Sequence, residues 1–342
     1  MSEPASPATA LPAVLAFDGG GSKTDVAIVA ADGTLLATAR GPGSNPDITG
    51  RDEAIAILAE LAADAAAKAG VPPGGLIAKH TTACLAGADL PEEEAELGAV
   101  IRALGWSVTT SVVNDTFAVL RAGLDDAGRH WGIGVVCGHG INCVGVAPDG
   151  RTTRFPALGY LSGDWGGGGD LGPEALWWAI RAEDGRGPQT ELRAAVAAHF
   201  GVDRVEDAVV GLQLGKIDHA EVHGLVPVLF TVAGHGDEVA RSVVLRQADE
   251  VCLMATVAAR RLGLAGDGGS PVPVVLGGSL MTARDPLLSG AIREQLAVSI
   301  PGADVRIVDV PPIAGAALLG LDQVAAGPDA AARLRASAAA TW

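Results

Sequence analysis

The residues with the clearest chemical potential form a glycine-rich turn that begins with a carboxylate. Residues 18–24 read Asp-Gly-Gly-Gly-Ser-Lys-Thr and stand between two short apolar segments. A glycine turn between strands leaves backbone N–H groups free and lets a ligand approach the main chain closely. The carboxylate of Asp18 could hold Mg²⁺, usually through water, and Lys23 could contact a phosphate. The turn is therefore compatible with a polyphosphate site as well as with a plain hairpin.

Two further glycine segments repeat this chemistry. Residues 138–142 read Gly-His-Gly-Ile-Asn between predicted strands, and residues 277–279 read Gly-Gly-Ser after a late apolar segment. A Rossmann or P-loop turn leads into a helix, whereas the turn at 18–24 leads into a strand. Two strand-to-strand turns that face each other could bind a polyphosphate from both sides. The predicted nucleotide-binding residues are Gly19, Gly20, Gly21, Ser22, Lys23, Thr24, Gly138, His139, Gly140, Gly277, Gly278 and Ser279.

A candidate general base, Asp115, follows a predicted strand. Phosphoryl transfer depends mostly on positioning and charge neutralisation, with a base that accepts the proton of the attacking hydroxyl. An aspartate between a strand and a helix lies at the edge of an α/β domain, where a substrate can reach it. Because aspartate also favours the N-terminus of a helix, the spacing alone leaves a capping role equally open.

A regular order of strands and helices must position these residues. An Asp-Gly turn at residues 32–33 predicts a hairpin. The strand–glycine turn–strand pattern restarts near residue 131, which indicates a duplicated fold. The predicted strands are 14–17, 25–30, 34–39, 76–85, 107–113, 131–137, 143–147, 151–155 and 272–276. The predicted helices are 52–70, 91–104 and 116–122, with mainly helices over 173–265 and after the last strand.

This order predicts a two-domain α/β protein. A chain of 342 residues exceeds the usual size of a single core. We expect a small N-terminal α/β domain over residues 1–117 and a larger C-terminal α/β domain over residues 118–342, with a cleft between them. The last helix of the second domain can return to the first.

Composition and charge disfavour several functional classes. A net charge of −16 argues against general binding to nucleic acid or to anionic membranes, because both need a basic surface. The longest apolar segments are strand-length, and the first twelve residues have no basic start of a signal peptide. None of the four cysteines has CxxC spacing. We therefore expect a cytoplasmic protein with free thiols that binds neither nucleic acid nor membranes.

The glycine motifs resemble those of the family that joins N-acetylglucosamine kinases to the BadF/BadG-type ATPases. Residues 17–24 are similar to its first phosphate motif, residues 138–142 to its second, and residues 277–279 to its adenosine motif. The resemblance extends over residues 14–321. It implies an actin-like ATPase fold of the ribonuclease H type, ATP and Mg²⁺ as cofactors and often a homodimer. It also implies that Asp115 is the catalytic base.

The segment 159–172 resembles the sugar-site segment Gly-Gly-Trp-Gly…Gly-Asp-Glu-Gly of this family. Asp164 replaces the usual glycine before the tryptophan, and Leu171 replaces the glutamate. The spacing between the tryptophan, Trp165, and the aspartate, Asp170, is one residue shorter than in the family. Residues 85–89, Leu-Ala-Gly-Ala-Asp, resemble a second sugar-contacting segment of the family, Leu-Ser-Gly-Gly-Asp. Ala86 stands where the family has a serine and therefore lacks its hydroxyl. The sugar-binding residues that the resemblance implies are Asn45, Gly87, Asp89, Asp115, Asn142, Asp164, Trp165 and Asp170.

The altered loop favours a sugar with a free amine. A carboxylate at Asp164 would attract an ammonium group, whereas an acetamide offers no charge to pair. Charge-assisted hydrogen bonds are worth ~1.5–3 kcal/mol, which corresponds to roughly ten- to a hundredfold discrimination. The main hypothesis is ATP-dependent phosphorylation of glucosamine to glucosamine 6-phosphate. Asp164 could instead organise the glycine loop through its own hydrogen bonds.

Other functions stay open. An N-acetylglucosamine kinase or a glucokinase would keep the mechanism and change the sugar. A BadF-type activator of a dehydratase would hold an iron–sulfur cluster with cysteines in a Cys-Ala-Ala-Gly-Thr-Gly setting, and the sequence contains no such segment. A non-catalytic sugar sensor is disfavoured, because Asp115 and all three nucleotide motifs are retained.

Overall fold

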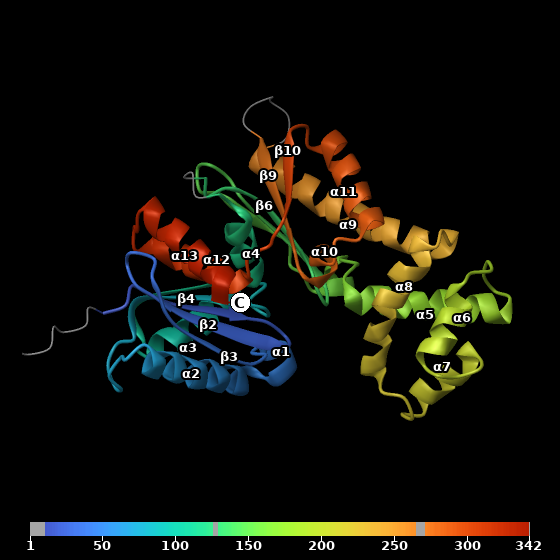
Figure 1. The fold of residues 1–342 in the computed structure, drawn as a ribbon, viewed down its shortest axis with the longest axis horizontal. Helices are drawn as coiled ribbons and strands as arrows, with labels where there is room; N and C mark the ends of the chain where they lie inside the picture. The colour runs from blue at the N-terminus through green and yellow to red at the C-terminus, as the bar shows by residue number, and fades with distance from the viewer. Residues whose placement is uncertain (1–10, 126–128, 265–270, 342) are drawn as a thin grey trace, which may run out of the picture. The chain divides into compact units, whose positions relative to one another are not determined.

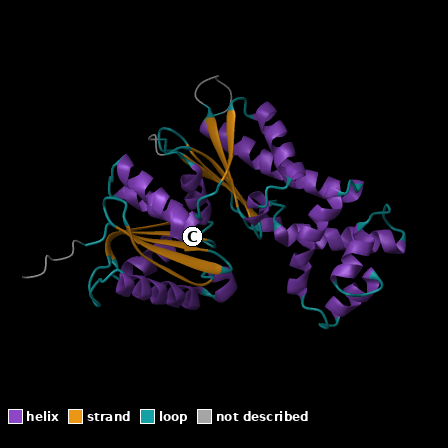
Figure 2. Ribbon diagram, in the orientation of Figure 1, coloured by secondary structure: helices purple, strands orange, loops and turns teal. Residues whose placement is uncertain are grey.

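The computed structural model describes residues 11–125, 129–264 and 271–341. The chain divides into two compact units, each built around one five-stranded sheet (Figures 1 and 2). The first unit comprises the described residues up to Trp131 and those from Val308 onward, and the second comprises those within Gly132–Ile307.

The first sheet has the strand order β3-β2-β1-β4-β5. Its first three strands form an antiparallel meander, and the last two run parallel to β1. Because side chains alternate along a strand, Leu15 and Phe17 of β1 pack in one apolar cluster, and Val14 and Ala16 pack in another on the opposite face. The strands are β1 (Val14–Gly19), β2 (Lys23–Val29), β3 (Leu35–Pro42), β4 (Ala78–Leu85) and β5 (Ser107–Asn114).

The helices of the first unit cover both faces of this sheet. One face packs against α2 (Arg51–Lys68) and α3 (Pro91–Ala103), and the other packs against α4 (Asp115–Gly123) and α12 (Pro312–Gln323). The remaining helices are the short α1 (Pro46–Thr49) and the C-terminal α13 (Pro328–Thr341).

The division of the chain differs from the expected boundary at residue 117. The first unit continues to Trp131, because α4 packs against α12 and against the strands β1, β4 and β5. Two C-terminal helices, rather than only the last one, belong to the first unit. The second unit is therefore an insertion in the sequence of the first.

The second sheet has the strand order β10-β9-β6-β7-β8. The sequence pattern predicts only helices after residue 276, whereas the structure has the strand β10 there. This strand is five residues long and pairs with β9 at the edge of the sheet. Such a short segment carries little local signal, because its pairing partner supplies most of its stabilisation. The strands are β6 (Gly132–Cys137), β7 (Ile141–Val146), β8 (Thr152–Arg154), β9 (Val272–Gly277) and β10 (Ala303–Ile307).

Helices make up the rest of the second unit. The longest is α9 (Glu238–Leu262), which begins at the side-chain cap Asp237 and ends at Gly263, whose φ of 71° is the left-handed conformation that favours glycine. The others are α5 (Gly168–Asp184), α6 (Leu192–His199), α7 (Val205–Gln213), α8 (Leu225–Gly234), α10 (Ser279–Thr282), α11 (Pro286–Ser299) and the 3₁₀ helices Gly159–Ser162 and His219–Gly224.

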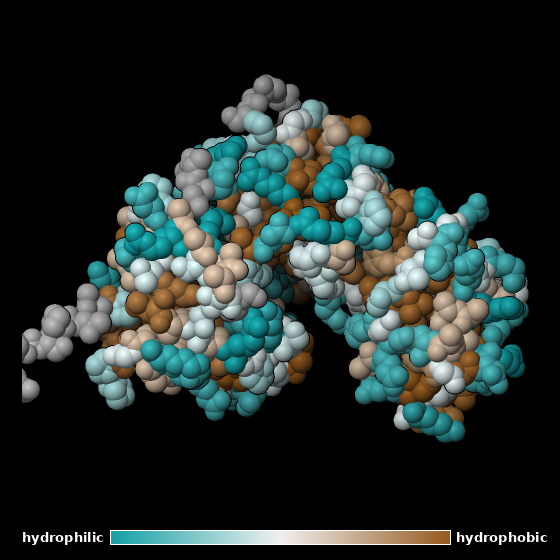
Figure 3. Space-filling view, viewed as in Figure 1, coloured by the Kyte–Doolittle hydropathy of each residue, from teal (hydrophilic) through white to brown (hydrophobic). Residues whose placement is uncertain are grey.

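Hydrophobic and hydrophilic side chains both reach the surface of each unit in the space-filling view (Figure 3). This mixture is ordinary, because apolar atoms contribute more than half of the surface of folded proteins. No helix in the described parts of the chain combines the length and the apolar character needed to cross a membrane.

Candidate active site

The turn between β1 and β2 is closed by the main chain and fixed by the end of β3. The N–H of Gly20 donates to the carbonyl of Lys23 at 2.9 Å, and the N–H of Ser44 donates to the carbonyl of Gly20 at 3.0 Å. A Cβ atom at Gly43 would lie 2.2 Å from the carbonyl oxygen of Gly21, so only glycine fits there. Thr24 is buried, and its hydroxyl donates to Ser44. Thr24 therefore braces the turn instead of facing an open site.

Two carboxylates lie close together in the first unit. Burial is the main cause that raises the pKa of Asp18 to about 8, and the negative charges of Asp115 and Asp25 add to it. Burial also raises the pKa of Asp115 to about 6, although a hydrogen bond from the N–H of Thr116 acts in the opposite direction. Both carboxylates are therefore partly desolvated groups whose ionised forms would gain from a nearby cation.

The residues around Asp18 fit a magnesium ion. No hydrogen bond or ion pair from the described residues reaches the carboxylate of Asp18. A desolvated carboxylate without a protein partner suits a hard cation that keeps part of its water shell. Asp18 would hold this ion, and Asp115 would lie beside it.

The N-terminus of α4 is capped by Asn114 and not by Asp115. The side-chain oxygen of Asn114 accepts the N–H of Thr116 at 2.9 Å. The capping alternative for Asp115 is therefore wrong. Asp115 is the first helical residue, and the capping hydrogen bond does not use its carboxylate.

A buried ion cluster lies beside the turn, and Asp25 and Arg40 of this cluster are not among the site residues predicted from the sequence. The side chain of Asp25 is 1% exposed and pairs with Lys23 at 2.9 Å and with both Nε and Nη2 of Arg40. A signal for it exists in the sequence, because Lys23 and Asp25 share one face of a strand. The hairpin turn at residues 32–33 further places Arg40 opposite Asp25.

The sugar-side residues of the first unit gather at the ends of β4 and β5. Gly87 has a φ of 78°, and a Cβ atom there would lie 2.6 Å from the side-chain oxygen of Asn45. Asp89 accepts a hydrogen bond from the amide of Asn114 at 2.6 Å. These contacts bring three of the expected sugar-binding residues next to the strand that leads into Asp115.

In the second unit, the glycine turn and the predicted sugar loop are joined by their backbones. The N–H of Gly168 donates to Gly138 at 2.9 Å, and the N–H of Gly169 donates to His139 at 2.7 Å. Gly167 has a φ of 81°, and a Cβ atom there would lie 2.4 Å from the carbonyl oxygen of His139. The loop can pass this close to the turn only because it consists of glycines.

Side chains at both ends of this contact are committed to the main chain. Asp170 accepts the N–H of Gly166 at 2.7 Å, and the side-chain oxygen of Asn142 accepts the N–H of Cys143 at 2.7 Å. Both residues were expected to bind sugar, and this role stays a prediction. In the structure, Asp170 shapes the loop and Asn142 shapes the start of β7.

Two residues of the helix α9 contact the predicted sugar loop. Gln247 is fully buried, and its side-chain oxygen accepts the N–H of Gly167 at 2.8 Å. The guanidinium of Arg246 lies 3.7 Å from the centre of the Trp165 ring, a cation–π contact. The sequence does not predict Arg246 and Gln247 as site residues, because about 80 residues separate them from the loop and no local pattern marks them.

Asp164 is engaged within its own loop. Its carboxylate accepts a hydrogen bond from the hydroxyl of Ser162, and its N–H donates to Gly159 at 3.0 Å. A second carboxylate, Glu250, lies nearby: burial raises the pKa of Glu250, Asp164 adds to this effect, and Arg246 opposes it. These contacts support the loop-organising alternative for Asp164.

A pocket of about 680 Å³ next to the second glycine turn suits a nucleoside. Gly278 precedes the lining residue Ser279. It has a φ of 87°, and a Cβ atom there would lie 2.2 Å from the carbonyl oxygen of Cys137. This close approach joins the predicted adenosine motif to the strand that carries the second turn. The pocket is lined by Gly138, His139, Gly168, His223, Val226, Pro227, Phe230, Ser279, Leu280, Ala283, Arg284, Asp285 and Pro286.

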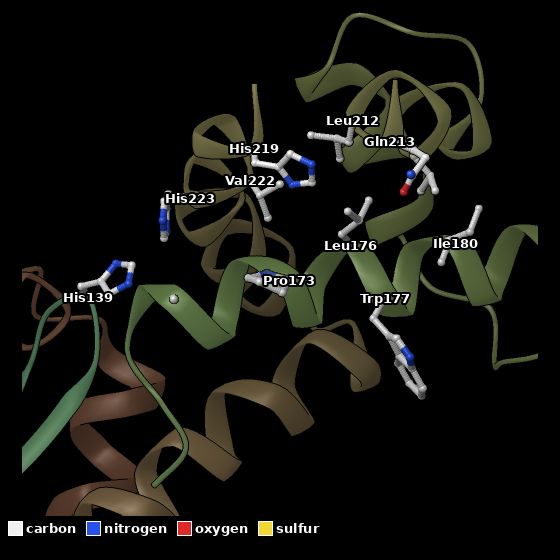
Figure 4. Close-up of a pocket in the computed structure, with 12 residues that line it drawn as sticks. His139, Pro173, Leu176, Trp177, Ile180, Leu212, Gln213, His219, Val222 and His223 are labelled. Carbon is white, nitrogen blue, oxygen red and sulfur yellow. The ribbon is translucent and has the colours of Figure 1, made fainter. Parts of the chain in front are cut away.

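A second cavity of about 580 Å³ adjoins the first through His139 and His223, whose rings meet edge to face at 4.8 Å. Figure 4 shows these two histidines at one end and Leu212 and Gln213 at the other. The lining of this second cavity is mainly apolar.

The expectation of free thiols is confirmed, because all four cysteines are free and buried.

Comparisons with known proteins agree with this arrangement. The model of the BadF/BadG/BcrA/BcrD ATPase family matches residues 16–320. An N-acetylmuramic acid/N-acetylglucosamine kinase of Clostridium acetobutylicum is 30% identical over 70% of this chain and 77% of its own length. An N-acetyl-D-glucosamine kinase of Dictyostelium discoideum is 27% identical over 90% of this chain and 97% of its own length.

Solved structures show the same fold. A structure from Chromobacterium violaceum, assigned as an N-acetylglucosamine kinase, has a TM-score of 0.69 and 25% identity, and the match covers 91% of this chain and 99% of that one. A ROK family glucokinase from Streptomyces griseus has a TM-score of 0.52 and 15% identity over 91% of this chain and 99% of its own. The predicted two-domain actin-like ATPase fold is thereby confirmed.

Proposed function

Because the chain belongs to the BadF/BadG/BcrA/BcrD ATPase family, we propose that it transfers a phosphoryl group from ATP to a hydroxyl of N-acetylglucosamine. The kinase activity rests on the relatives, which are sugar kinases that match most of the chain. The choice of the acetylated sugar replaces the glucosamine hypothesis as the main one. It follows the substrates named for both relatives, and it agrees with the engagement of Asp164 by Ser162.

The observation that carries the proposal is the carboxylate of Asp115 beside that of Asp18. Asp115 is not used as a helix cap, and its pKa of about 6 brings it close to neutral pH. A general base works best when its pKa lies near the working pH. Asp115 is thus suited to accept the proton of the sugar hydroxyl as this hydroxyl attacks the terminal phosphoryl group.

The other residues bind and orient the substrates. Mg²⁺ bound at Asp18 would supply charge neutralisation for the phosphoryl oxygens. The free N–H groups within each glycine turn are suited to hold phosphate oxygens. Asp89, which is fixed by Asn114, would orient the sugar next to Asp115. The rate gain would come mainly from this positioning.

The test is the initial rate of ADP release with Mg·ATP and, in separate reactions, N-acetylglucosamine, N-acetylmuramic acid, glucosamine and glucose at equal concentrations. We expect the highest rate with N-acetylglucosamine and its loss in Asp115→Asn, with Asp149→Asn in an exposed turn as the matched control. No turnover of any of the four sugars would refute the proposal.

Glucosamine remains the second candidate, because two carboxylates, Asp164 and Glu250, lie close enough for one charge to act on the other. A free amine could pair with them. Asp164→Gly should then lower the rate on glucosamine far more than the rate on glucose, and equal losses on both sugars would exclude this role. We also propose a cytoplasmic homodimer, as the family resemblance implies, and light scattering of the purified protein would measure its mass.

A further inference from the structure

We infer that Arg40 is a second phosphate-binding cation of the first glycine turn, and that the buried Asp25 fixes it there. The inference rests on the proposed function, in which the terminal phosphoryl group of ATP lies beside Asp18. No motif pointed to Arg40 or Asp25. Both are identified by their contacts in the first unit.

The three residues Asp18, Asp25 and Arg40 form a row across β1, β2 and β3. The strand register pairs Asp18 with Asp25 and Asp25 with Arg40. Directly paired residues project from the same face of a sheet. This face also carries Ala16 and Ala27, which pack in the cluster that contains residues of α4 and α12. The row therefore lies on the face where α4 begins with Asp115.

The cation at the end of this row is close enough to act on Asp18. The positive charges of Lys23 and Arg40 both lower the pKa of Asp18. The hydrogen bond to Asp25 is the main cause that raises the pKa of Arg40, and the negative charge of Asp18 adds to it. A phosphoryl group that is to reach Asp115 must pass next to Asp18. It would then lie within the field of both cations.

The backbone that carries Arg40 is fixed relative to the turn. Ser44, four residues later, donates its N–H to Gly20 and accepts the hydroxyl of Thr24 at 2.9 Å. Gly43 packs against Gly21 without space for a side chain. Arg40 therefore cannot move away from the turn unless these contacts break.

The side chain of Arg40 is both fixed and available. Its Nε and Nη2 donate to Asp25, whose carboxylate is 1% exposed, while the side chain of Arg40 is 52% exposed. A guanidinium has five N–H donors, so the Nη1 group and one N–H of Nη2 can still bind a ligand. An arginine held in this way presents a preformed fork to phosphate oxygens, which a lysine cannot do.

Stability alone is a weak reason for this cluster. A buried ion pair pays a desolvation cost, and a well-packed apolar pair in its place is often neutral or stabilising. The cluster combines two half-exposed cations, Lys23 and Arg40, with one buried anion, Asp25. The cluster of Lys23, Asp25 and Arg40 therefore carries one net positive charge beside the turn, which suits a polyphosphate.

The first experiment measures equilibrium binding of ATP and of ADP, each with Mg²⁺, to Arg40→Gln and Arg40→Lys. We expect Arg40→Gln to weaken ATP roughly ten- to a hundredfold and ADP much less, and Arg40→Lys to fall in between. The matched control is Arg151→Gln, which removes an arginine from another aspartate-paired site in the second unit. If Arg40→Gln binds ATP as tightly as the control does, the role of Arg40 is refuted.

A second variant, Asp25→Asn, separates positioning from charge. It removes a negative charge, so a pure charge effect would strengthen ATP binding relative to ADP. If Asp25 fixes the fork of Arg40, the variant weakens ATP relative to ADP instead. A strengthened ATP affinity would overturn the role of Asp25. Thermal unfolding of each variant shows whether it is folded.

These measurements are independent of the sugar. A wild-type protein that turns over no sugar, and whose ATP affinity still depends on Arg40, would refute the proposed function and retain the inference. A wild-type protein that phosphorylates N-acetylglucosamine, and in which Arg40→Gln leaves ATP affinity unchanged, would refute the inference alone.

Discussion

Replacement of Asp18 by asparagine should abolish activity and yet stabilise the protein in the absence of Mg²⁺ and nucleotide. Burial and two neighbouring carboxylates raise the pKa of Asp18 from 3.8 to about 8. A carboxyl group with a raised pKa binds its proton more tightly in the folded state. Its contribution to stability is therefore complete below pH 3.8 and is lost as the pH rises to about 8.

The magnitude follows from the shift. Each pKa unit corresponds to about 1.36 kcal/mol, so a shift of about 4 units sets an upper limit of about 5 kcal/mol at pH 9. Relaxation and water entry reduce this value, and we expect a gain of about 2 kcal/mol or more in Asp18→Asn. For a unit of this size, 1 kcal/mol corresponds to roughly 2–4 °C in the midpoint of unfolding. The variant should thus unfold at least ~4 °C above the wild type.

The assay is thermal unfolding between pH 6 and pH 9 with EDTA present, and Asp149→Asn is the control. As the pH falls below 8, the difference in unfolding free energy between the variant and the wild type should decrease by up to about 1.4 kcal/mol per pH unit. Added Mg²⁺ at pH 8 should stabilise the wild type and not the variant. An Asp18→Asn protein that is less stable than the wild type, or a gap that does not change with pH, would refute the reasoning.

Three further predictions concern named contacts. Asp115→Asn should lower kcat about 10²–10⁴-fold with little change in ATP affinity. In the wild type, kcat/KM should decrease below about pH 6, because the base becomes protonated. A pH–rate profile checks this, and a flat profile would count against it. Gly167→Ala should raise the KM for the sugar, because its Cβ atom would lie 2.4 Å from the carbonyl oxygen of His139, whereas Gly234→Ala, where no atom lies within 4 Å, should behave as wild type. Gln247→Leu should destabilise the protein by about 1–3 kcal/mol, because the N–H of Gly167 loses its buried acceptor; unchanged denaturant unfolding would contradict this.

The parts of the fold that the sequence predicts are those with local signals. The glycine turn after Asp18 and the hairpin at residues 32–33 predict the first three antiparallel strands, because the type of a turn depends on adjacent residues. The strand β10 and the return of the C-terminal helices could not be found in this way. Their stabilisation comes from pairing with β9 and from packing on β1, which are contacts between distant parts of the chain.

The candidate site follows the same division. Asp115 and its neighbour Asn114 form one local pattern, although only the structure shows that Asn114 is the cap. The support for the sugar loop comes from Arg246 and Gln247 on α9, and no spacing rule connects them to residue 167. The glucosamine hypothesis was drawn from Asp164 alone, and the sequence could not show that Ser162 already engages this carboxylate.

The interrupted sequence of the first unit has a consequence for how the chain folds during synthesis. One face of β1, with Val14 and Ala16, is covered by α12, which the ribosome makes only after the inserted unit. Roughly 180 residues separate Trp131 from α12, which at about 5–20 residues per second is roughly ten to forty seconds of elongation. During this interval the nascent sheet carries an uncovered apolar face, so this unit completes its core only after the inserted unit has left the ribosome.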